Sequence, residues 1–253
     1  MSAGLDRTGI RLRPRLLRLV ATGGLLLSAP GLAQAAPAPP AAAVLSRPLP
    51  VPRQEIALTF DDGPGSAATA KILALLRNHG AHATFFVLGT ELERYPGLAA
   101  EAAREGNELA DHGMSHRAFP RLGAKRLLYE LRTTADLILE LSGRPPAFVR
   151  PPYGRVNQRV VQVARRLHMT VALWTVDTRD WQNPGATAIA RRVLQNLRPG
   201  EIVLMHDGGG PRQQTVEAVR MILAGLDRRG YTSVTLGQLV RDARPPVAAA
   251  PGA

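Results

Sequence analysis

Two adjacent carboxylates stand where an apolar segment of the chain stops. The run Ile56 to Phe60 consists of strand-forming side chains, and Asp61 and Asp62 follow it directly. Gly63 and Pro64 come next, and this pair is typical of a turn rather than of a continuing strand. A turn after a strand can direct two neighbouring carboxylates into one pocket in different roles, such as metal ligand and general base. The simpler alternative is a turn that carries an extra acid.

A pair of histidines lies further along the chain. His112 and His116 stand at positions i and i+4, so one helical turn would bring both imidazoles to one face, at a spacing that suits one metal ion. Zinc peptidases with this spacing carry a glutamate base after the first histidine, whereas Gly113 occupies that position here and favours a tight loop. Asp61 or Asp62 would then supply the base. The other carboxylate would complete a set of two histidines and one carboxylate that leaves metal positions open. Two surface histidines in a loop are the simpler alternative.

Strands and helices must position these side chains. The sequence alternates short apolar runs, which we predict to be strands, with longer amphipathic segments, which we predict to be helices. The predicted strands are Ile56 to Phe60, Ala83 to Leu88, Phe148 to Arg150, Thr170 to Trp174, Ile202 to His206 and Tyr231 to Thr235. The predicted helices are Ala67 to Asn78, Pro96 to Glu105, Ala124 to Ser142, Gln158 to Leu167, Ala186 to Leu197 and Gln213 to Arg229. This alternation indicates a mainly parallel sheet, open or closed into a barrel, with the polar residues at the edge where strands lead into helices. Glycines that favour left-handed helix caps follow predicted helices at Gly80, Gly106, Gly143, Gly200 and Gly230.

The two ends of the chain differ in composition from its centre. Residues 1–35 combine an Arg-rich start, a mostly apolar stretch and the small-residue pattern Ala33-Gln34-Ala35, which together predict a secretory signal peptide. An uncleaved membrane anchor is the alternative, although the apolar stretch is short for a span. We predict an Ala/Pro-rich linker over residues 36–52, a catalytic domain over 53–244 and an Ala/Pro-rich disordered tail over 245–253.

Composition excludes several functional classes. The chain has no cysteine, which rules out disulfides, thiolate metal ligands and a cysteine nucleophile. Its formal net charge of +12 would suit a polyanion, but part of this charge lies in the leader and no basic run is interleaved with aromatic residues. We therefore expect no nucleic-acid partner.

Five short motifs in order resemble those of one family. They are Thr59 to Pro64, the pair His112 and His116, Arg150 to Gly154, Asp177 to Trp181, and Leu204 to Asp207. In this order the chain resembles the polysaccharide deacetylase family, also called the NodB homology domain or carbohydrate esterase family 4, over about residues 55 to 240. The resemblance implies a single α/β domain, built as a distorted (β/α) barrel with about seven mainly parallel strands.

The resemblance also implies a role for each carboxylate and histidine of the first two motifs. Asp62, His112 and His116 would hold one divalent metal ion, with Zn²⁺ expected and Co²⁺ or Ni²⁺ as alternatives. Asp61 would act as the base that takes a proton from the attacking water. Arg150 would orient Asp61 and hold it as the anion.

The remaining motifs would complete the catalytic pocket. His206 would protonate the departing amine, and Asp180 would raise the pKa of His206. The backbone N–H of Tyr153 would stabilise the oxyanion. Trp181 and Leu204 would line the space that receives the acetyl methyl group.

One position departs from the family pattern. The family usually has Ser or Thr after the first metal-binding histidine, where this chain has Gly113. The departure leaves the ligands intact and raises the question of how firmly this loop is held. Asp111 is a candidate for orienting His112, because it is adjacent in sequence.

We therefore predict a metal-dependent hydrolase that removes N-acetyl groups from a β-linked aminosugar polymer. The export signal favours N-acetylglucosamine of peptidoglycan as the substrate. The alternatives are a chitin or chito-oligosaccharide deacetylase, an acetyl-xylan esterase and a glycan-binding wall protein without activity. We expect a secreted, periplasmic or cell-envelope monomer that meets the membrane only through its N-terminal segment, if that segment stays uncleaved.

Overall fold

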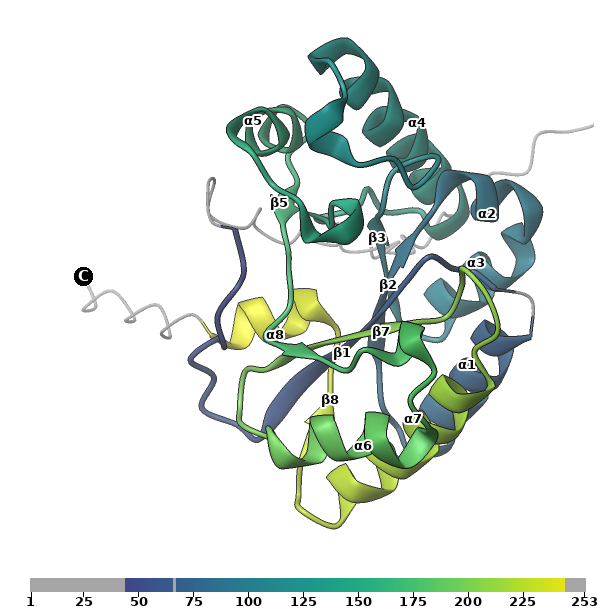
Figure 1. Ribbon diagram of the computed structural model, residues 1–253, viewed down its shortest axis with the longest axis vertical. Helices are drawn as coiled ribbons and strands as arrows, with labels where there is room; N and C mark the ends of the chain where they lie inside the picture. Colours follow the sequence, from purple (N-terminus) through teal and green to yellow (C-terminus); the bar gives the residue numbers. More distant parts are fainter. Residues whose placement is uncertain (1–43, 66, 244–253) are drawn as a thin grey trace, which may run out of the picture. The chain divides into compact units, whose positions relative to one another are not determined.

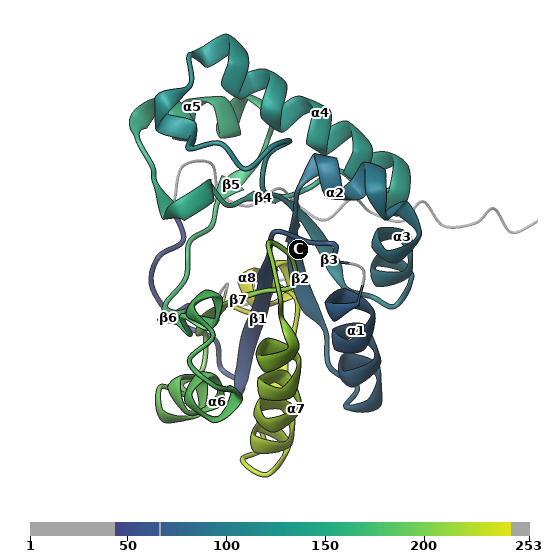
Figure 2. The same cartoon turned by 45° about the vertical axis from the view of Figure 1, so that its right-hand side comes forward.

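The computed structural model describes residues 44–65 and 67–243. The strands in this part of the chain are β1 (Glu55–Asp61), β2 (Ala83–Val87), β3 (Glu108–Asp111), β4 (Phe148–Val149), β5 (Thr170–Val171), β6 (Val176–Asp177), β7 (Ile202–His206) and β8 (Thr232–Ser233). Seven of them follow one another in the order β5-β4-β3-β2-β1-β7-β6, and β8 pairs with the start of β1. Every one of these pairings is parallel. The sheet curls (Figures 1 and 2), and the predicted distorted (β/α) barrel is confirmed.

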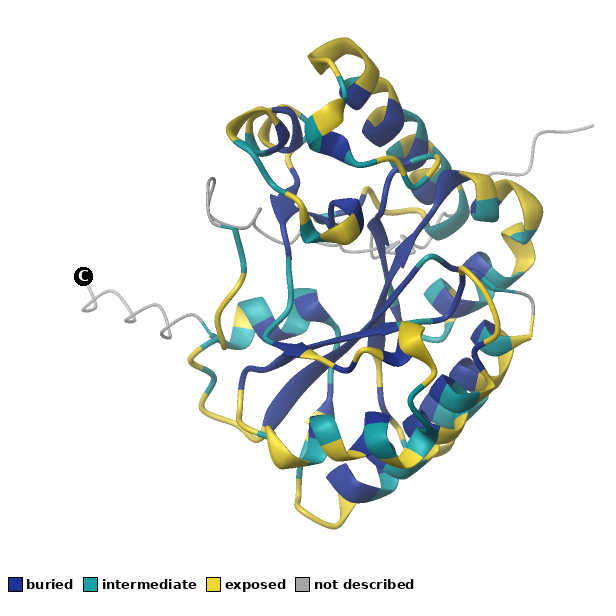
Figure 3. Cartoon of the chain, in the orientation of Figure 1, coloured by how far each residue is buried: buried dark blue, intermediate teal, exposed yellow. Residues whose placement is uncertain are grey.

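The helices cover the outside of this sheet. They are α1 (Ala68–Asn78), α2 (Gly89–Arg94), α3 (Pro96–Arg104), α4 (Ala124–Ser142), α5 (Gln158–Arg166), α6 (Ala186–Gln195), α7 (Gln213–Asp227) and α8 (Leu236–Asp242). Single 3₁₀ turns lie at η1 (Phe119–Arg121), η2 (Pro152–Gly154) and η3 (Asp180–Gln182). Figures 1 and 2 show α1, α7 and α6 packed side by side, whereas α4 and α5 pack together beside β5. The buried faces of these helices point toward the sheet and their exposed faces point outward (Figure 3).

The predicted elements match the structure except at its shortest parts. The sequence pattern missed β3, β6, α2 and α8, and it extended the last predicted strand beyond the two residues of β8. β3 reads Glu-Leu-Ala-Asp and lacks the β-branched or aromatic residues that mark a strand. The helix-capping prediction is confirmed at four glycines, which adopt positive φ and donate to a carbonyl oxygen of the preceding helix: Gly80, Gly106, Gly143 and Gly230. It is wrong at Gly200, which also has positive φ but lies beyond Asn196, the C-cap of α6, and donates to the carbonyl oxygen of Glu55.

Strand β1 lies at the centre of the fold and is buried along its whole length. Its side chains alternate between two cores, because successive residues of a strand point to opposite faces. Leu58 and Phe60 join the large core under α1 and α7. Ala57 joins the inner core that α8 covers. Thr59 and Asp61 continue the inner face, so the first carboxylate of the motif points into the barrel.

Residues 44–52 lie against the barrel, although the sequence assigned them to the linker. Leu45 pairs with Ala172 in a parallel bridge, and the Leu49 N–H donates to the carbonyl oxygen of Gly200. Leu45, Leu49 and Val51 pack on the inner core. These contacts make residues 44–52 part of the described fold, which the sequence had predicted to begin at residue 53. The prolines of this segment suit an extended stretch at the edge of the sheet, and such a stretch can still bury its leucines.

Several expectations fall on residues that the structure leaves undescribed. These are the signal peptide of residues 1–35, the start of the linker and the tail of residues 245–253. Among the helices of the described part, none has the length and apolar composition that crossing a membrane requires.

Candidate functional site

The strand register brings the predicted site residues to the carboxyl edge of the sheet. Asp61 of β1 stands opposite His206 of β7 in register. His112 and Arg150 directly follow β3 and β4, whose final residues pair with each other. Since parallel strands end at the same edge, segments that are distant in sequence meet there.

Asp62, His112 and His116 converge closely enough to hold one ion. The Asp62 Oδ1 atom lies 3.4 Å from Nε2 of His112 and 3.2 Å from Nε2 of His116. This oxygen is buried and has no hydrogen-bond partner among the described residues, which leaves it free to bind a cation. The His112 Nδ1 atom lies 2.6 Å from the carbonyl oxygen of Arg150. Because a carbonyl only accepts, Nδ1 carries the proton, and the lone pair of Nε2 faces the space between His112, Asp62 and His116, where a cation could bind. One carboxylate oxygen and two imidazole nitrogens suit a divalent ion such as zinc, so these residues form a candidate metal site.

The protonation states of this set also fit a cation. Burial raises the pKa of Asp62, but the neighbouring histidines outweigh burial and hold it below its usual range. Burial lowers the pKa of His116, against the opposing charge of Asp62. A charged carboxylate and a neutral imidazole are the forms that bind metals.

Three of the predicted residues hold a strained backbone. Asp62, His116 and Tyr153 adopt φ values of 71°, 54° and 62°, in the left-handed region that side chains other than glycine rarely occupy. Strain of this kind collects at functional sites, where the surrounding structure enforces it.

The loop between the two histidines explains the departure at Gly113. Its φ is 84°, and a Cβ atom at this position would lie 2.8 Å from the ring of Phe119. A serine or threonine would therefore clash. The Asp111 Oδ1 atom accepts a 2.6 Å hydrogen bond from the Gly113 N–H. Asp111 thus holds the loop, and the prediction that it orients His112 is wrong, since the Arg150 carbonyl does so.

Glu130 of α4 is a site residue that the sequence interpretation missed. Its fully buried carboxylate accepts hydrogen bonds from the backbone N–H groups of Met114 and Ser115, at 3.1 and 3.0 Å. Arg126 donates to it at 2.8 Å from the same helix. Glu130 therefore anchors the two residues that precede His116. A glutamate on the buried face of an amphipathic helix is the signal that could have identified it.

Asp61 is held by Arg150 inside the barrel. The Arg150 side chain is fully buried, and its Nη1 atom donates to Asp61 Oδ1 at 2.7 Å and to Thr59 Oγ1 at 2.8 Å. Its Nε and Nη2 atoms donate to the carbonyl oxygens of Ala172 and Leu173. Four hydrogen bonds fix the guanidinium, so the charge beside Asp61 is permanent and its direction is set.

His206 is held by Asp180 in a second pair. The His206 Nδ1 atom lies 2.7 Å from Asp180 Oδ1. Asp180 Oδ2 accepts from the His206 backbone N–H and from Thr215 Oγ1, both at 2.8 Å. Burial lowers the pKa of His206, but Asp180 and then Asp61 and Asp62 outweigh burial and raise it. The raised pKa favours the protonated ring, and the bond of Nδ1 to Asp180 leaves Nε2 for the pocket.

Asp61, Asp62, His112, His116 and His206 line one pocket of about 390 Å³, and Arg150 and Asp180 support it from behind Asp61 and His206. Tyr153 and Trp181 stand at its rim, where they are 64% and 51% exposed, and Leu204 lies in its wall. The edge of the Tyr153 ring packs against His116. All ten residues predicted for the site are brought together at this edge of the sheet: Asp61, Asp62, His112, His116, Arg150, Tyr153, Asp180, Trp181, Leu204 and His206. The pocket also includes Trp174, Asp177 and Arg212, which were not predicted as site residues.

The pocket combines the parts that hydrolysis needs. A candidate metal site lies beside a carboxylate that a buried guanidinium holds in place and an imidazole that a second carboxylate supports. Such a set can take a proton from water and deliver one to a leaving group. The fold and the pocket thus define a hydrolase built on a (β/α) barrel.

Comparison with known proteins agrees with this class. The family model for polysaccharide deacetylase matches residues 49–172. A peptidoglycan-N-acetylglucosamine deacetylase of Bacillus cereus is 38% identical over 195 residues, which span 76% of this chain and 91% of that protein. A chitooligosaccharide deacetylase of a Bradyrhizobium species is 36% identical and covers 74% of this chain and 90% of its own length. The solved structure of the peptidoglycan deacetylase PdaC from Bacillus subtilis is 38% identical, with a TM-score of 0.70, and covers 76% of this chain and 92% of that one.

The chain belongs to the polysaccharide deacetylase family. The family resemblance that the five motifs indicated is confirmed, and so is the prediction of a hydrolase.

Proposed function

We propose that this protein is a metal-dependent deacetylase that removes N-acetyl groups from N-acetylglucosamine in peptidoglycan. One observation carries the proposal. Asp61 and His206, held by separate buried partners, flank the Asp62, His112 and His116 set in a single pocket. The similarity to the Bacillus cereus peptidoglycan-N-acetylglucosamine deacetylase supports the choice of peptidoglycan as the substrate.

Asp62, His112 and His116 would hold the ion, which we propose to be zinc. When bound there, the ion would act as a Lewis acid that polarises the amide carbonyl and lowers the pKa of a water molecule. Asp61 takes the proton of the attacking water, and the hydrogen bond from Arg150 keeps this base oriented beforehand.

His206 and Tyr153 act on the other side of the scissile bond. His206 donates its proton to the departing amine, a role that suits an imidazole whose pKa Asp180 raises. The N–H of Tyr153 makes no hydrogen bond to another residue in the described part of the chain, so it is free to stabilise the oxyanion. Trp181 and Leu204 shape the wall against which the acetyl methyl group packs.

The proposal places the enzyme at the cell envelope, because residues 1–35 have the pattern of an export signal and the wall is where its substrate lies.

Release of acetate tests the proposal. Purified, zinc-loaded protein is incubated with peptidoglycan, chitotetraose and acetyl xylan at equal acetyl concentration, and each reaction is repeated after chelation. We expect acetate from peptidoglycan at the highest kcat/KM, its loss on chelation and its recovery with zinc. The absence of acetate from all three substrates would leave a glycan-binding protein and would overturn the enzymatic proposal.

Deacetylation of chito-oligosaccharides is the second candidate. The similarity to the Bradyrhizobium chitooligosaccharide deacetylase, over a comparable length and at comparable identity, favours it. A higher kcat/KM for chitotetraose than for peptidoglycan would establish this alternative.

A further inference from the structure

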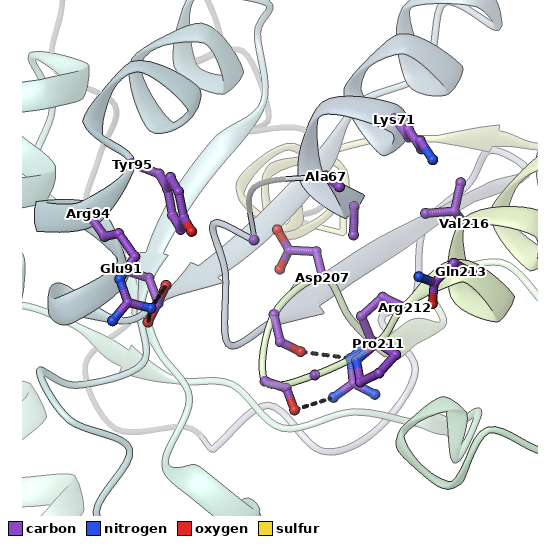
Figure 4. A pocket seen from close by; sticks show the side chains of 15 residues that line it. Ala67, Lys71, Glu91, Arg94, Tyr95, Asp207, Pro211, Arg212, Gln213 and Val216 are labelled. Atoms are coloured by element: carbon purple, nitrogen blue, oxygen red, sulfur yellow. Dashed lines mark hydrogen bonds and ion pairs between the residues drawn. The ribbon is translucent and has the colours of Figure 1, made fainter.

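A second cavity of about 380 Å³ lies beside the catalytic pocket. Figure 4 shows its lining, which comes from the start of α1, the end of α2 and the loop between β7 and α7. Arg212 lines this cavity and the catalytic pocket as well. Arg212 therefore forms a wall that the two spaces share.

The lining of this cavity carries uncompensated positive charge. Lys71, Arg94 and Arg212 contribute cations, and Arg94 pairs with Glu91 at 3.3 Å. Neither Lys71 nor Arg212 has a carboxylate within ion-pair distance among residues 44–65 and 67–243. Arg212 is only 6% exposed, and its donors reach carbonyl oxygens of the β7–α7 loop, which carry no net charge. A buried guanidinium without a counter-ion favours an anion nearby.

The one other acid of the lining is Asp207. The fold uses its Oδ2 atom, whereas its Oδ1 atom is buried and has no hydrogen-bond partner among the described residues. Its carboxylate packs so closely on the backbone of Gly63 that a Cβ atom there would overlap it. Its Oδ2 atom accepts a 2.5 Å hydrogen bond from Thr69 Oγ1. Burial raises the pKa of Asp207 to about 7, against the opposing hydrogen bond from Thr69. Asp207 therefore offsets part of the positive charge of the lining.

We propose that this cavity is a subsite for the sugar next to the one that is deacetylated, and that Lys71 and Arg212 bind a carboxylate of that sugar or of its stem peptide. Tyr95 borders the same space and offers a ring on which a sugar can pack (Figure 4). In peptidoglycan, N-acetylglucosamine alternates with N-acetylmuramic acid. The lactyl group of N-acetylmuramic acid is a free carboxylate where the stem peptide has been removed, and elsewhere it is amide-linked to a peptide that bears carboxylates of its own. Chitin has no carboxylate. The subsite rests on the proposed function and narrows its substrate class to acidic aminosugar polymers.

The two lysines of the chain give a matched pair of variants. Lys71 lines the cavity, and Lys125 is an exposed residue of α4 that lines neither pocket. Affinities of the zinc-loaded protein are measured by calorimetry for chitotetraose, for a peptide-free tetrasaccharide of alternating N-acetylglucosamine and N-acetylmuramic acid, and for the same tetrasaccharide with its peptides. The measurements use wild type, K71E and K125E.

We expect K71E to weaken binding of the peptide-free acidic tetrasaccharide by about tenfold and to change chitotetraose binding by less than about twofold, since only a charge contact is reversed. K125E should change neither. If K71E weakens binding of the tetrasaccharide with peptides but not of the peptide-free one, the anion that the site binds is a carboxylate of the stem peptide and not the lactyl group. Equal losses for acidic and neutral ligands, or no loss for either acidic ligand, would overturn the subsite.

Acetate release by the wild type is measured separately from binding. If K71E binds the acidic tetrasaccharides selectively more weakly but the wild-type protein releases no acetate, the subsite is supported and the proposed deacetylase activity is refuted. If the wild-type protein releases acetate but K71E binds every ligand as the wild type does, the deacetylase activity is supported and the subsite is refuted.

Discussion

The buried carboxylate of Glu130 sets how firmly His116 is presented, and replacement by glutamine tests this. Oε2 of Glu130 accepts from the N–H groups of Met114 and Ser115, directly before His116. Glutamine keeps the shape of the side chain and an oxygen for these donors, but it removes the charge. The second carboxylate oxygen, which Arg126 contacts, becomes an amide.

The expected magnitude follows from these contacts. A hydrogen bond to a charged group contributes about 1.5–3 kcal/mol and a neutral one about 0.5–1.5, so two weakened bonds cost about 2 kcal/mol. Arg126 is half-exposed and its guanidinium can be solvated instead, so loss of its contact with Glu130 adds little to this cost. If the whole loss falls on the ion-bound form, the dissociation constant for zinc rises by roughly 30-fold. This lies within the roughly 10- to 100-fold range that outer partners of metal ligands produce.

Competition with a chromophoric chelator measures this constant in wild type, Glu130→Gln and the control Glu140→Gln. Glu140 lies on the same helix and is exposed, so its replacement should leave zinc affinity unchanged. Activity of Glu130→Gln should recover at saturating zinc. A variant that loses thermal stability but binds zinc within about twofold of wild type would refute the reasoning, because Glu130 would then support α4 and not the loop.

Three further predictions concern the groups around Asp61 and His206. Asp61→Asn should lower kcat by about 10²–10⁴-fold and retain one zinc per chain, as metal analysis and acetate release will show; full activity would assign the base elsewhere. Arg150→Met should lower the free energy of unfolding by about 3–5 kcal/mol in denaturant titration, since it leaves Asp61 buried without its partner, and a loss below about 1 kcal/mol would contradict this. Asp180 raises the pKa of His206, so activity should fall as the pH rises through that pKa, and Asp180→Asn should move this alkaline limb to lower pH; an unmoved limb in the kcat/KM profile would exclude His206 as the acid.

The polar residues of the five motifs could be predicted because they follow strand ends or lie in the turns that come next. Asp61 ends an apolar run, and the parallel order of the sheet then places it opposite His206. The division between base and ligand came from the family and not from spacing. The structure accords with it, because Asp61 contacts Arg150 while Asp62 Oδ1 has no hydrogen-bond partner in the described part of the chain.

The residues that sequence reasoning missed depend on contacts that no local pattern encodes. Glu130 reaches a loop that precedes its own helix, and Arg212 folds back on its own loop at the border of two cavities. Residues 44–52 look like a linker because of their prolines, yet Leu45 and Leu49 find their apolar partners only once the barrel has formed. Each of these features exists only in the tertiary structure.

The left-handed backbone at Asp62, His116 and Tyr153 bears on attempts to make this protein more robust. Each such residue costs the fold on the order of 1–3 kcal/mol, and glycine would remove most of that cost. Selection for heat resistance alone will therefore favour glycine at these three positions. Glycine at Asp62 or His116 removes a candidate metal ligand, whereas glycine at Tyr153 keeps the backbone N–H and removes the ring that packs against His116. A screen that scores melting temperature together with zinc retention avoids that outcome.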